Sequence, residues 1–431
     1  MKERVRASGF HPSPFTLHPF QVAVVGGGAA GYFAAIRCAE ADPRARVHVF
    51  EKSLHPLAKV RISGGGRCNV THACFEPREL VRRYPRGSRE LIGVFHRFGP
   101  RDTIAWFEER GVQLKTEPDG RMFPVTDSSA TIIGALTDAA TQAGVEVRLQ
   151  TPVKSIERTE GGRFILTLAA GETFEADRVL LATGGTQGAG GIEIARAFGH
   201  TIEPQAPSLF AFNIQDERLR GLEGVSVPDA GAGIAAMGLK DHGPLLITHR
   251  GLSGPAVLRL SAWGAREIQA SGYRFELSVN WARPHTHASA LELLTKERSV
   301  HSRRQVANSC PLPLPNRLWE MLVSAVRIQR GAVWAHASNA ILAKLAAEVV
   351  DSRFAVTGKS MNKEEFVTCG GVRLREVDFK TMESRIRPGL HFAGEVLDID
   401  GVTGGFNFQA AWSTGWLAGS AMASDPNARS R

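Results

Sequence analysis

Three glycines and one carboxylate near the amino end have the spacing of a dinucleotide-binding site. Gly26, Gly28 and Gly31 form G-x-G-x-x-G between an apolar run and a helical stretch. In this pattern the first glycine permits a tight turn, the second lets a pyrophosphate approach the backbone, and the third lets the helix pack on the sheet. Glu51 follows about 20 positions later, where a carboxylate can accept hydrogen bonds from an adenosine ribose. The combination predicts N–H groups at a helix start that face bound phosphates.

The elements that must hold these residues form one βαβ unit. Val22–Val25 predicts a strand, Ala29–Ala41 a helix that stops before Pro43, and Val47–Phe50 the next strand. A second match, G-x-G-x-x-A at Gly231–Ala236, lacks this setting, because a proline and an aspartate precede it and glycines follow it closely. We therefore place the dinucleotide at the first motif only.

Helix and strand continue to alternate up to residue 185. The expected elements are a helix capped by Ser128 or Ser129 and closed by Gly144, a strand at Val145–Leu149, a hairpin of Phe164–Leu168 and Thr173–Ala176, and a strand at Asp177–Thr183. The alternation disappears between Pro204 and about Gly358, which predicts an inserted domain whose later part is helical. It resumes near Phe366, and a last helix is expected at Asn407–Ala423, with the small residues Ala411, Gly415 and Gly419 on one face.

These patterns divide the chain into five parts. The predicted parts are an N-terminal extension (1–19), the first part of the nucleotide-binding domain (20–203), an inserted substrate domain (204–358), the C-terminal part of the nucleotide-binding domain (359–423) and a tail (424–431).

Composition limits the compartment and the partners. The most apolar window is interrupted by glycines, so no membrane span is expected. The chain has five cysteines, and this odd number argues against a secreted disulfide framework and favours the cytoplasm. A formal net charge of +9 suits a polyanion such as nucleic acid, or else describes a generally basic surface. Two clusters keep the first option open: Arg78, Arg82, Arg83, Arg86 and Arg89, and then Lys296, Arg298, Arg303 and Arg304.

Several long motifs in a fixed order resemble one family. They read VVGGGAAG at Val24–Gly31, RISGGGRCNVT at Arg61–Thr71, LLATGG at Leu180–Gly185, ITHRGLSGPAVL at Ile247–Leu258 and GLHFAGEVLDIDGVTGG at Gly389–Gly405. Between Gln21 and Ala423 the chain resembles the BaiN/RdsA family of NAD(P)/FAD-dependent oxidoreductases, YhiN-like flavoproteins. The resemblance implies an α/β fold: a glutathione-reductase-like, doubly wound FAD-binding domain with an inserted β-barrel plus helical domain.

The resemblance also implies which residues hold FAD. The last helix, starting near Asn407, would direct its positive end at the part of the flavin where charge collects on reduction; alternatively, this helix only packs. The expected cofactor-binding residues are Gly26, Gly28, Ala29, Ala30, Gly31, Glu51, Lys52, Arg61, Gly64, Gly65, Gly66, Arg67, Cys68, Asn69, Val153, Thr183, Gly184, Gly394, Glu395, Asp398, Gly404, Gly405, Phe406 and Asn407.

One segment departs from the family pattern. After Gly184 and Gly185, related sequences usually carry a longer loop with a Ser-Tyr-Pro element, whereas this chain has the short TQGAGG at Thr186–Gly191. The geometry on the substrate side is therefore harder to transfer than the cofactor site.

The cysteines do not suit a dithiol mechanism. Disulfide reductases need two close cysteines, and Cys68 and Cys74 lack the C-x-x-C spacing. We therefore expect FAD to exchange hydride directly with NAD(P)H and with a substrate.

The resemblance points to reduction of an activated carbon–carbon double bond, in a conjugated small-molecule enone or in the uracil ring of ribosomal RNA. A hydride would pass to the electron-poor carbon, and an acid would protonate its neighbour. Cys68, Asn69 and His72 are the candidates for that acid or for polarising a carbonyl; alternatively, they are a packing residue, a loop hydrogen-bonder and an exposed side chain. A protein that binds FAD without turnover, as a redox sensor, is a further possibility.

Overall fold

The computed structural model describes residues 20–185, 190–360 and 367–423. In this part of the chain the main sheet has seven strands in the order β19-β20-β21-β10-β1-β2-β6. The central pairs β21–β10, β10–β1, β1–β2 and β2–β6 are parallel, and β19 and β20 add an antiparallel edge. The strands are β1 Gln21–Val25, β2 Arg46–Phe50, β6 Glu146–Arg148, β10 Arg178–Leu181, β19 Val377–Asp378, β20 Glu383–Ser384 and β21 Leu390–Phe392.

The sheet reverses its winding between β1 and β10. Successive strands run outward from β1 through β2 to β6, and the later strands β10 and β21 are added on the other side of β1. In open α/β sheets, ligands bind at such a switch point, beyond the carboxyl ends of the strands. The G-x-G-x-x-G turn follows β1 directly and so lies at this place.

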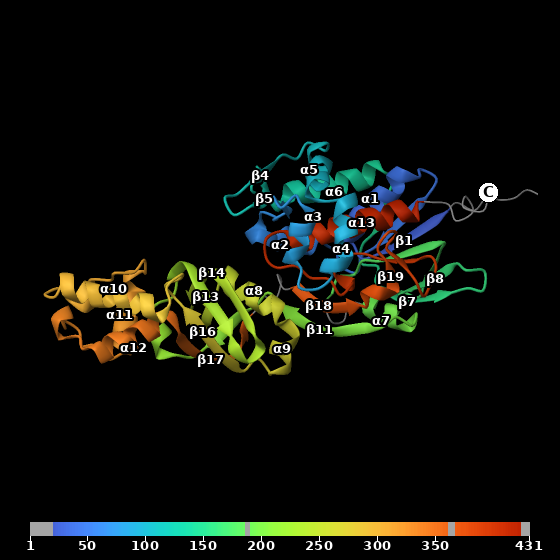
Figure 1. Cartoon of the computed structure of the whole chain (residues 1–431). Coiled ribbons are helices and arrows are strands. Elements are labelled where there is room, and N and C mark those ends of the chain that lie inside the picture. Colours follow the sequence, from blue (N-terminus) through green and yellow to red (C-terminus); the bar gives the residue numbers. More distant parts are fainter. Residues whose placement is uncertain (1–19, 186–189, 361–366, 424–431) are drawn as a thin grey trace, which may run out of the picture.

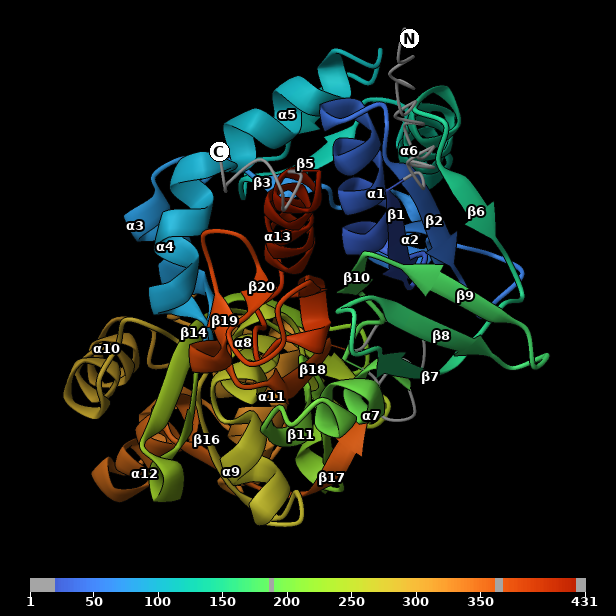
Figure 2. The ribbon, with the colours of Figure 1, turned by 90° about the vertical axis from the view of Figure 1, so that its right-hand side faces the viewer.

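Two helices from opposite ends of the sequence pack side by side on the sheet (Figure 2). They are α1 (Ala29–Ala41) and α13 (Phe406–Met422). A Cβ added at Gly415 would lie 2.6 Å from the Ala30 carbonyl oxygen, and one at Gly419 would collide with the Ala34 carbonyl oxygen. The small residues predicted on one face of the last helix therefore let the two backbones approach closely.

The remaining elements of this half surround the same core. The helices are α2 (Ala58–Gly66), α3 (Pro77–Leu80), α4 (Ser88–Arg97), α5 (Pro100–Glu108), α6 (Ser129–Gln142) and α7 (Gly190–Ala197). One small antiparallel sheet contains β3 (Thr71–His72), β4 (Leu114–Thr116) and β5 (Arg121–Pro124), and another contains β7 (Val153–Arg158), β8 (Phe164–Leu168) and β9 (Thr173–Ala176).

A closed barrel with helices forms the other half of the molecule (Figure 1). Its strands are β12 (Ala211–Ile214), β13 (Ser226–Ile234), β14 (Leu239–Thr248), β15 (Gly251–Ser253), β16 (Phe275–Asn280) and β17 (Ser352–Ser360). The helices are α8 (Pro255–Trp263), α9 (Ala265–Ala270), α10 (His287–Val300), α11 (Asn316–Ala325) and α12 (Asn339–Val350). The last three lie at the end of the molecule farthest from the main sheet (Figure 1).

Two strands connect the halves: β11 (Ile202–Ser208) pairs with β18 (Val367–Val372). The barrel with its helices has its own hydrophobic core, separate from the core under the main sheet. These observations confirm the predicted fold class, a doubly wound nucleotide-binding domain with a β-barrel plus helices. The boundaries proposed at 203/204 and 358/359 stay a prediction.

Most elements agree with the sequence patterns. Ser128 caps α6, its hydroxyl accepting a hydrogen bond from Ala130 N (3.3 Å), and the hairpin β8–β9 is present with β7 added as a third strand. Gly231–Ala236 belongs mainly to barrel strand β13, so its rejection as a nucleotide motif is confirmed. Within the described residues, no helix has the length and apolar character to span a bilayer. The predicted extension at 1–19, the tail at 424–431 and most of the short loop after Gly185 lie outside the described residues.

Candidate functional site

The sequence-predicted glycines bring the starts of two helices to one side of the sheet. Gly415 of α13 lies against Ala30 of α1 and Gly419 against Ala34, so the two helices run in the same direction. The N-caps are Gly28 and Gly405, and neither of these residues supplies a side-chain cap. Gly415 is the tenth residue of α13, whereas Ala30, which it contacts, is the second residue of α1. At about 1.5 Å per residue, the start of α13 therefore extends about 12 Å beyond the start of α1. The positive N-terminal ends of the two helices therefore face the same way and are displaced from each other along the helix axes.

The turn before α1 is shaped by glycine and by the carboxylate that follows β2. Gly26 has φ +111°, and a Cβ there would lie 2.5 Å from the Ala182 carbonyl oxygen of the neighbouring strand end. Glu51 Oε2 accepts a hydrogen bond from Gly27 N (2.7 Å), and its Oε1 accepts one from Ser53 N (2.8 Å). The carboxylate is thereby fixed beside the turn and keeps lone pairs for a further donor.

A segment close to the C-terminus completes this end of the site. A Cβ at Gly394 would lie 3.0 Å from Ala30 Cβ, and Gly394 N donates to Thr414 Oγ1 (3.0 Å). The neighbouring Glu395 forms an ion pair with Lys59 of α2 (2.6 Å). Residues far apart in sequence therefore meet around the start of α1, and the role in FAD binding that the resemblance implies for Gly394 and Glu395 stays a prediction. Thr183 and Gly184 lie at the adjacent end of β10.

The start of α13 is held by a side chain from the glycine-rich loop. Asn69 Oδ1, in the orientation that satisfies its surroundings, accepts a hydrogen bond from Gly405 N (2.9 Å), and its Nδ2 donates to Thr71 O (3.0 Å). Gly405 has φ +88°, and a Cβ there would lie 2.5 Å from the same Thr71 oxygen. Asn407 Oδ1 accepts from Gly401 N (2.8 Å) and fixes the turn before the helix. Asn69 and Asn407 therefore position the helix start.

Aromatic rings cover the same helix start. His72 stacks on Phe406 with the ring centroids 4.7 Å apart, and buried Tyr84 donates its hydroxyl to Phe406 O (2.6 Å). His72 Nε2 lies 3.0 Å from Asp119 O, an acceptor, so Nε2 carries the proton and Nδ1 offers a lone pair. Nδ1 is buried and has no hydrogen-bond partner among the described residues. His72 is thus half-buried rather than an exposed side chain.

Two of the candidates for the proton donor, Cys68 and His72, differ strongly in their pKa. Cys68 is fully buried, and burial raises the pKa of its thiol to about 12. Burial lowers the pKa of His72, so its imidazole is neutral near pH 7. A general acid works best when its pKa is near the working pH, which a thiol with a pKa of about 12 does not offer. Of the candidates Cys68, Asn69 and His72, only His72 has a free position for a proton within this structure.

Other predicted residues have partners outside the two helix starts, are exposed, or lie in neighbouring elements. Arg67 pairs with Glu117 (2.7 Å) and lies over the Phe123 ring, 4.0 Å from its centroid. Asp398 accepts from Gly370 N (2.9 Å) and pairs with Arg266 of α9 (2.8 Å). Lys52 and Arg61 are exposed, Val153 begins β7, and the backbone at Ser63–Gly65, near the end of α2, has non-helical dihedral angles.

Sequence reasoning missed a buried ion pair behind the C-terminal segment. Arg86 donates through Nε to Asp400 Oδ1 (2.5 Å) and through Nη2 to Oδ2, and Nη1 donates to Ala262 O of α8 (2.8 Å). Ser208 Oγ donates to Asp400 Oδ2 (3.0 Å). The sequence groups Arg86 with the arginines of a basic cluster, and in the motif LDID it indicates Asp398 rather than Asp400 as a site residue. Their pairing requires a contact between distant segments that spacing does not reveal.

The residues present fit a dinucleotide cofactor. A Cβ at Gly28 would meet no heavy atom within 4 Å of it, so the space over the start of α1 is open while the neighbouring glycines are packed. Uncapped N–H groups, an open backbone face and a fixed carboxylate beside it form the donor and acceptor set that a pyrophosphate and a ribose require. The second uncapped helix start, about 12 Å further along, suits the ring at the other end of such a cofactor.

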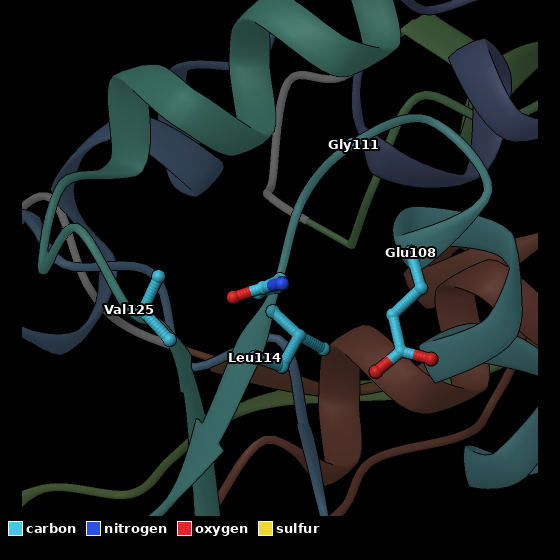
Figure 3. Close-up of a pocket in the computed structure, with 5 residues that line it drawn as sticks. Glu108, Gly111, Leu114 and Val125 are labelled. Atoms are coloured by element: carbon cyan, nitrogen blue, oxygen red, sulfur yellow. The ribbon is translucent and has the colours of Figure 1, made fainter.

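Two pockets lie outside the candidate cofactor site. One, of about 370 Å³, is lined by Glu108, Gly111, Gln113, Leu114 and Val125, between the end of α5 and the strands β4 and β5 (Figure 3). The other, of about 610 Å³, lies on the barrel and includes Lys240, Asp241, His242 and Arg283 among its lining residues. Neither contains a glycine of the two helix starts, so neither is part of the candidate cofactor site.

Comparison with known sequences matches almost the whole chain. The profile of the HI0933-like protein Rossmann domain matches residues 20–421. The ribosomal RNA dihydrouridine synthase of Escherichia coli (strain K12) is 32% identical over 410 residues, covering 92% of this chain and 96% of that protein. The 3-dehydro-bile acid delta(4,6)-reductase of Clostridium scindens is 28% identical over 418 residues, covering 94% of this chain and 100% of that protein.

Comparison with solved structures supports the fold. The 3-ketosteroid-delta4-(5alpha)-dehydrogenase from Rhodococcus jostii RHA1 aligns with a TM-score of 0.50 at 15% identity, over 96% of this chain and 99% of that one. The 3-ketosteroid delta1-dehydrogenase from Sterolibacterium denitrificans aligns with a TM-score of 0.50 at 13% identity, over 93% and 99% of the two chains. These alignments agree with the Rossmann-like arrangement described above.

Proposed function

The chain belongs to the HI0933-like family of Rossmann-domain proteins, and from this premise we propose that it is an FAD-dependent oxidoreductase that reduces an activated carbon–carbon double bond. The observation that carries the proposal is the stagger of two uncapped helix starts, α1 after Gly28 and α13 after Gly405. One positive end suits the pyrophosphate of FAD and the other suits the pyrimidine side of the flavin ring.

In this proposal each group of residues has a distinct task. The N–H groups that begin α1 bind the pyrophosphate, Glu51 accepts from the ribose, and the start of α13 stabilises negative charge on the ring. Asn69 fixes that helix start, and the rings of His72, Phe406 and Tyr84 exclude water behind it. When bound, FAD supplies the ability to take a hydride from one partner and give it to another. NAD(P)H is the proposed donor and becomes NAD(P)⁺.

We propose uridine in ribosomal RNA as the substrate. The uracil C5–C6 double bond would receive a hydride on one carbon and a proton on the other, giving dihydrouridine. The base would have to leave its stack to reach the site. Two facts support this choice over a small enone: the 32% identity to a ribosomal RNA dihydrouridine synthase over most of both chains, and the formal net charge of +9.

A small conjugated enone is the second candidate substrate. The 28% identity to a bile acid reductase, over the full length of that protein, favours it. Both reactions use the same hydride and proton transfers, so they differ in what holds the substrate and not in the cofactor site. With either substrate we propose a cytoplasmic enzyme.

The substrate proposal is tested by measuring dihydrouridine. We expect the purified protein, with FAD and NADH or NADPH, to form dihydrouridine in ribosomal RNA from a strain that lacks the gene, as detected by mass spectrometry of the nucleosides. The Gly28→Ala variant serves as the control with an impaired cofactor site. Unmodified RNA, together with rapid turnover of a conjugated 3-ketosteroid, would move the assignment to the second candidate.

We propose His72 as the residue that delivers the proton, through Nδ1. Because burial lowers its pKa, the protonated fraction at pH 7 is small and rises about tenfold for each unit that the pH falls toward the pKa. The rate at which substrate reoxidises the reduced flavin should therefore rise from about pH 8 to about pH 6.

A His72→Phe variant keeps the stacking on Phe406 and should be slower and lose the pH dependence. Stopped-flow absorbance measures both. Cys68→Ala tests the other candidate and should change the rate little, because its thiol has a pKa of about 12. An unchanged pH profile in His72→Phe would exclude His72.

A further inference from the structure

The helical end of the chain, residues 287–350, carries a net charge of +4, part of the +9 of the whole chain. Within it, residues 298–347 contain seven lysines and arginines and a single acidic residue, Glu320, while Glu292, Glu297 and Glu348 flank this stretch. This segment runs from the end of α10 through α11 to α12, at the end of the molecule farthest from the main sheet (Figure 1).

Backbone pairing brings two of its loops together. The loop after α10 and the loop after α11 are joined by hydrogen bonds from Val306 N to Ala332 O (2.9 Å) and from Trp334 N to Arg304 O (3.0 Å). Each loop carries two exposed arginines, and we call this set the arginine tip: Arg303, Arg304, Arg327 and Arg330.

The arginine tip lacks local compensation. Within the described residues, none of its four side chains forms an ion pair or a hydrogen bond. Neighbouring basic residues are engaged: Arg298 donates to Ala337 O (2.8 Å), and Arg218 pairs with Glu348 (2.6 Å). Near the first loop, Glu297 is bonded to His301 (2.8 Å) and also interacts electrostatically with Arg304, without a direct ion pair. Four exposed like charges that make no direct ion pair or hydrogen bond through their side chains within the described residues are available to an external polyanion.

The loops that carry these arginines are anchored in a packed core. Trp319 and Trp334 are 1% and 0% exposed and stack with ring centroids 6.4 Å apart. Trp319 Nε1 also donates to Val306 O (2.8 Å). The arginines therefore project from fixed backbone, which reduces the ordering cost when they bind phosphates.

We propose that the arginine tip docks the phosphate backbone of structured RNA while the target base enters the flavin site. This inference rests on the proposed function. Guanidinium groups match phosphate oxygens geometrically and remain charged, and an RNA with secondary structure is long enough to contact both ends of the protein. Because phosphate contacts fix register without reading sequence, the tip positions the RNA and the specificity arises near the flavin site.

The pocket on the barrel is a poorer docking site because Asp241, His242 and Arg283 of its lining already have charged partners, and Lys240 is its one lining cation with no ion pair within the described residues. Arg259 pairs with Asp241 (3.0 Å), His242 lies 3.2 Å from Asp229 Oδ1, and Arg283 lies 3.8 Å from the same aspartate. A phosphate bound there would compete with these carboxylates.

The test neutralises the arginine tip and measures the salt dependence of RNA binding. The full chain with Arg303, Arg304, Arg327 and Arg330 all changed to Gln is compared with wild type for binding to ribosomal RNA from a strain lacking the gene, by filter binding at several KCl concentrations. We expect the slope of log K against log salt to become shallower by about 3, since each lost phosphate contact contributes about 0.7 to 0.9. FAD content and the rate of flavin reduction should remain those of wild type.

A matched control removes equal charge elsewhere. It changes four exposed basic residues of the main-sheet half to Gln: Arg46, Lys154, Arg375 and Lys380. We expect the slope of this control to stay close to the wild-type slope. Equal slopes for the tip variant and wild type, or equal losses in both variants, would overturn the docking proposal while leaving the substrate proposal intact. Salt-insensitive wild-type binding, with no dihydrouridine formed, would remove both.

Discussion

The Asp400→Ala variant is expected to lose about 3–5 kcal/mol of unfolding free energy, as measured by urea denaturation. Asp400 is fully buried and accepts two hydrogen bonds from Arg86, whose side chain is only 13% exposed. Burial raises the pKa of the Asp400 carboxyl even though Arg86 opposes this. Removing the carboxylate leaves the guanidinium buried without its partner, and the cost of that unpaired charge is the source of the loss.

Two controls separate this mechanism from a general sensitivity to mutation. The double variant Arg86→Met/Asp400→Leu removes both charges and should recover most of the lost stability, since no unpaired charge remains. Glu79→Ala removes one partner of an exposed pair with Arg82 and should change the unfolding free energy by less than about 1 kcal/mol. A double variant as unstable as Asp400→Ala would show that the effect comes from packing or from the Ser208 and Ala262 contacts.

The ion pair of Arg86 and Asp400 also affects function because it connects three parts of the chain. Arg86 precedes α4, Asp400 lies in the segment that leads to α13, and Ala262 belongs to α8 beside the barrel. We therefore expect Asp400→Ala to weaken FAD binding as well, through the start of α13.

The Gly28→Ala variant is expected to bind FAD roughly a hundredfold more weakly without a loss of stability. Gly28 has φ −89° and ψ −172°, which alanine adopts readily, and its added Cβ would meet no protein atom within 4 Å. The methyl group would instead occupy the space through which the pyrophosphate approaches the backbone. Losing one or two charge-assisted hydrogen bonds costs about 3 kcal/mol. Fluorescence titration with FAD and thermal unfolding of the apoprotein measure the two effects.

Gly31→Ala provides the contrasting variant. A Cβ at Gly31 would collide with the Gly26 carbonyl oxygen, so this substitution should destabilise the apoprotein itself. If Gly28→Ala bound FAD as tightly as wild type, the pyrophosphate would not lie over the start of α1, and the assignment of this end of the site would be wrong.

The sequence contained strong signals for the local elements. The bounds of α1 agree residue for residue with the predicted Ala29–Ala41, because a glycine turn and a proline mark its ends. The small residues of the last helix predicted a close helix contact, and Gly415 against Ala30 confirms it. Hydrophobic periodicity, glycine turns and caps act over a few residues and can be read directly from one chain.

Contacts between distant segments could not be predicted in the same way. Asn69 is a polar loop residue in sequence, and only the fold reveals that its amide holds Gly405 N. Arg86 resembled its neighbours in a basic cluster, although it alone of them pairs with a buried aspartate. The concentration of charge after residue 298 was visible in part, but the lack of partners at the arginine tip depends on tertiary structure.

The most direct test of the account is a titration of the purified apoprotein with FAD, followed by flavin fluorescence and visible absorbance. We predict one FAD bound per chain, with the flavin spectrum perturbed on binding and with ADP competing for the same site. If ADP did not compete with FAD, the adenosine half of FAD would lie away from Glu51 and α1. A folded protein that leaves the spectrum and fluorescence of FAD unchanged would contradict the two-helix cofactor site on which the proposed function depends.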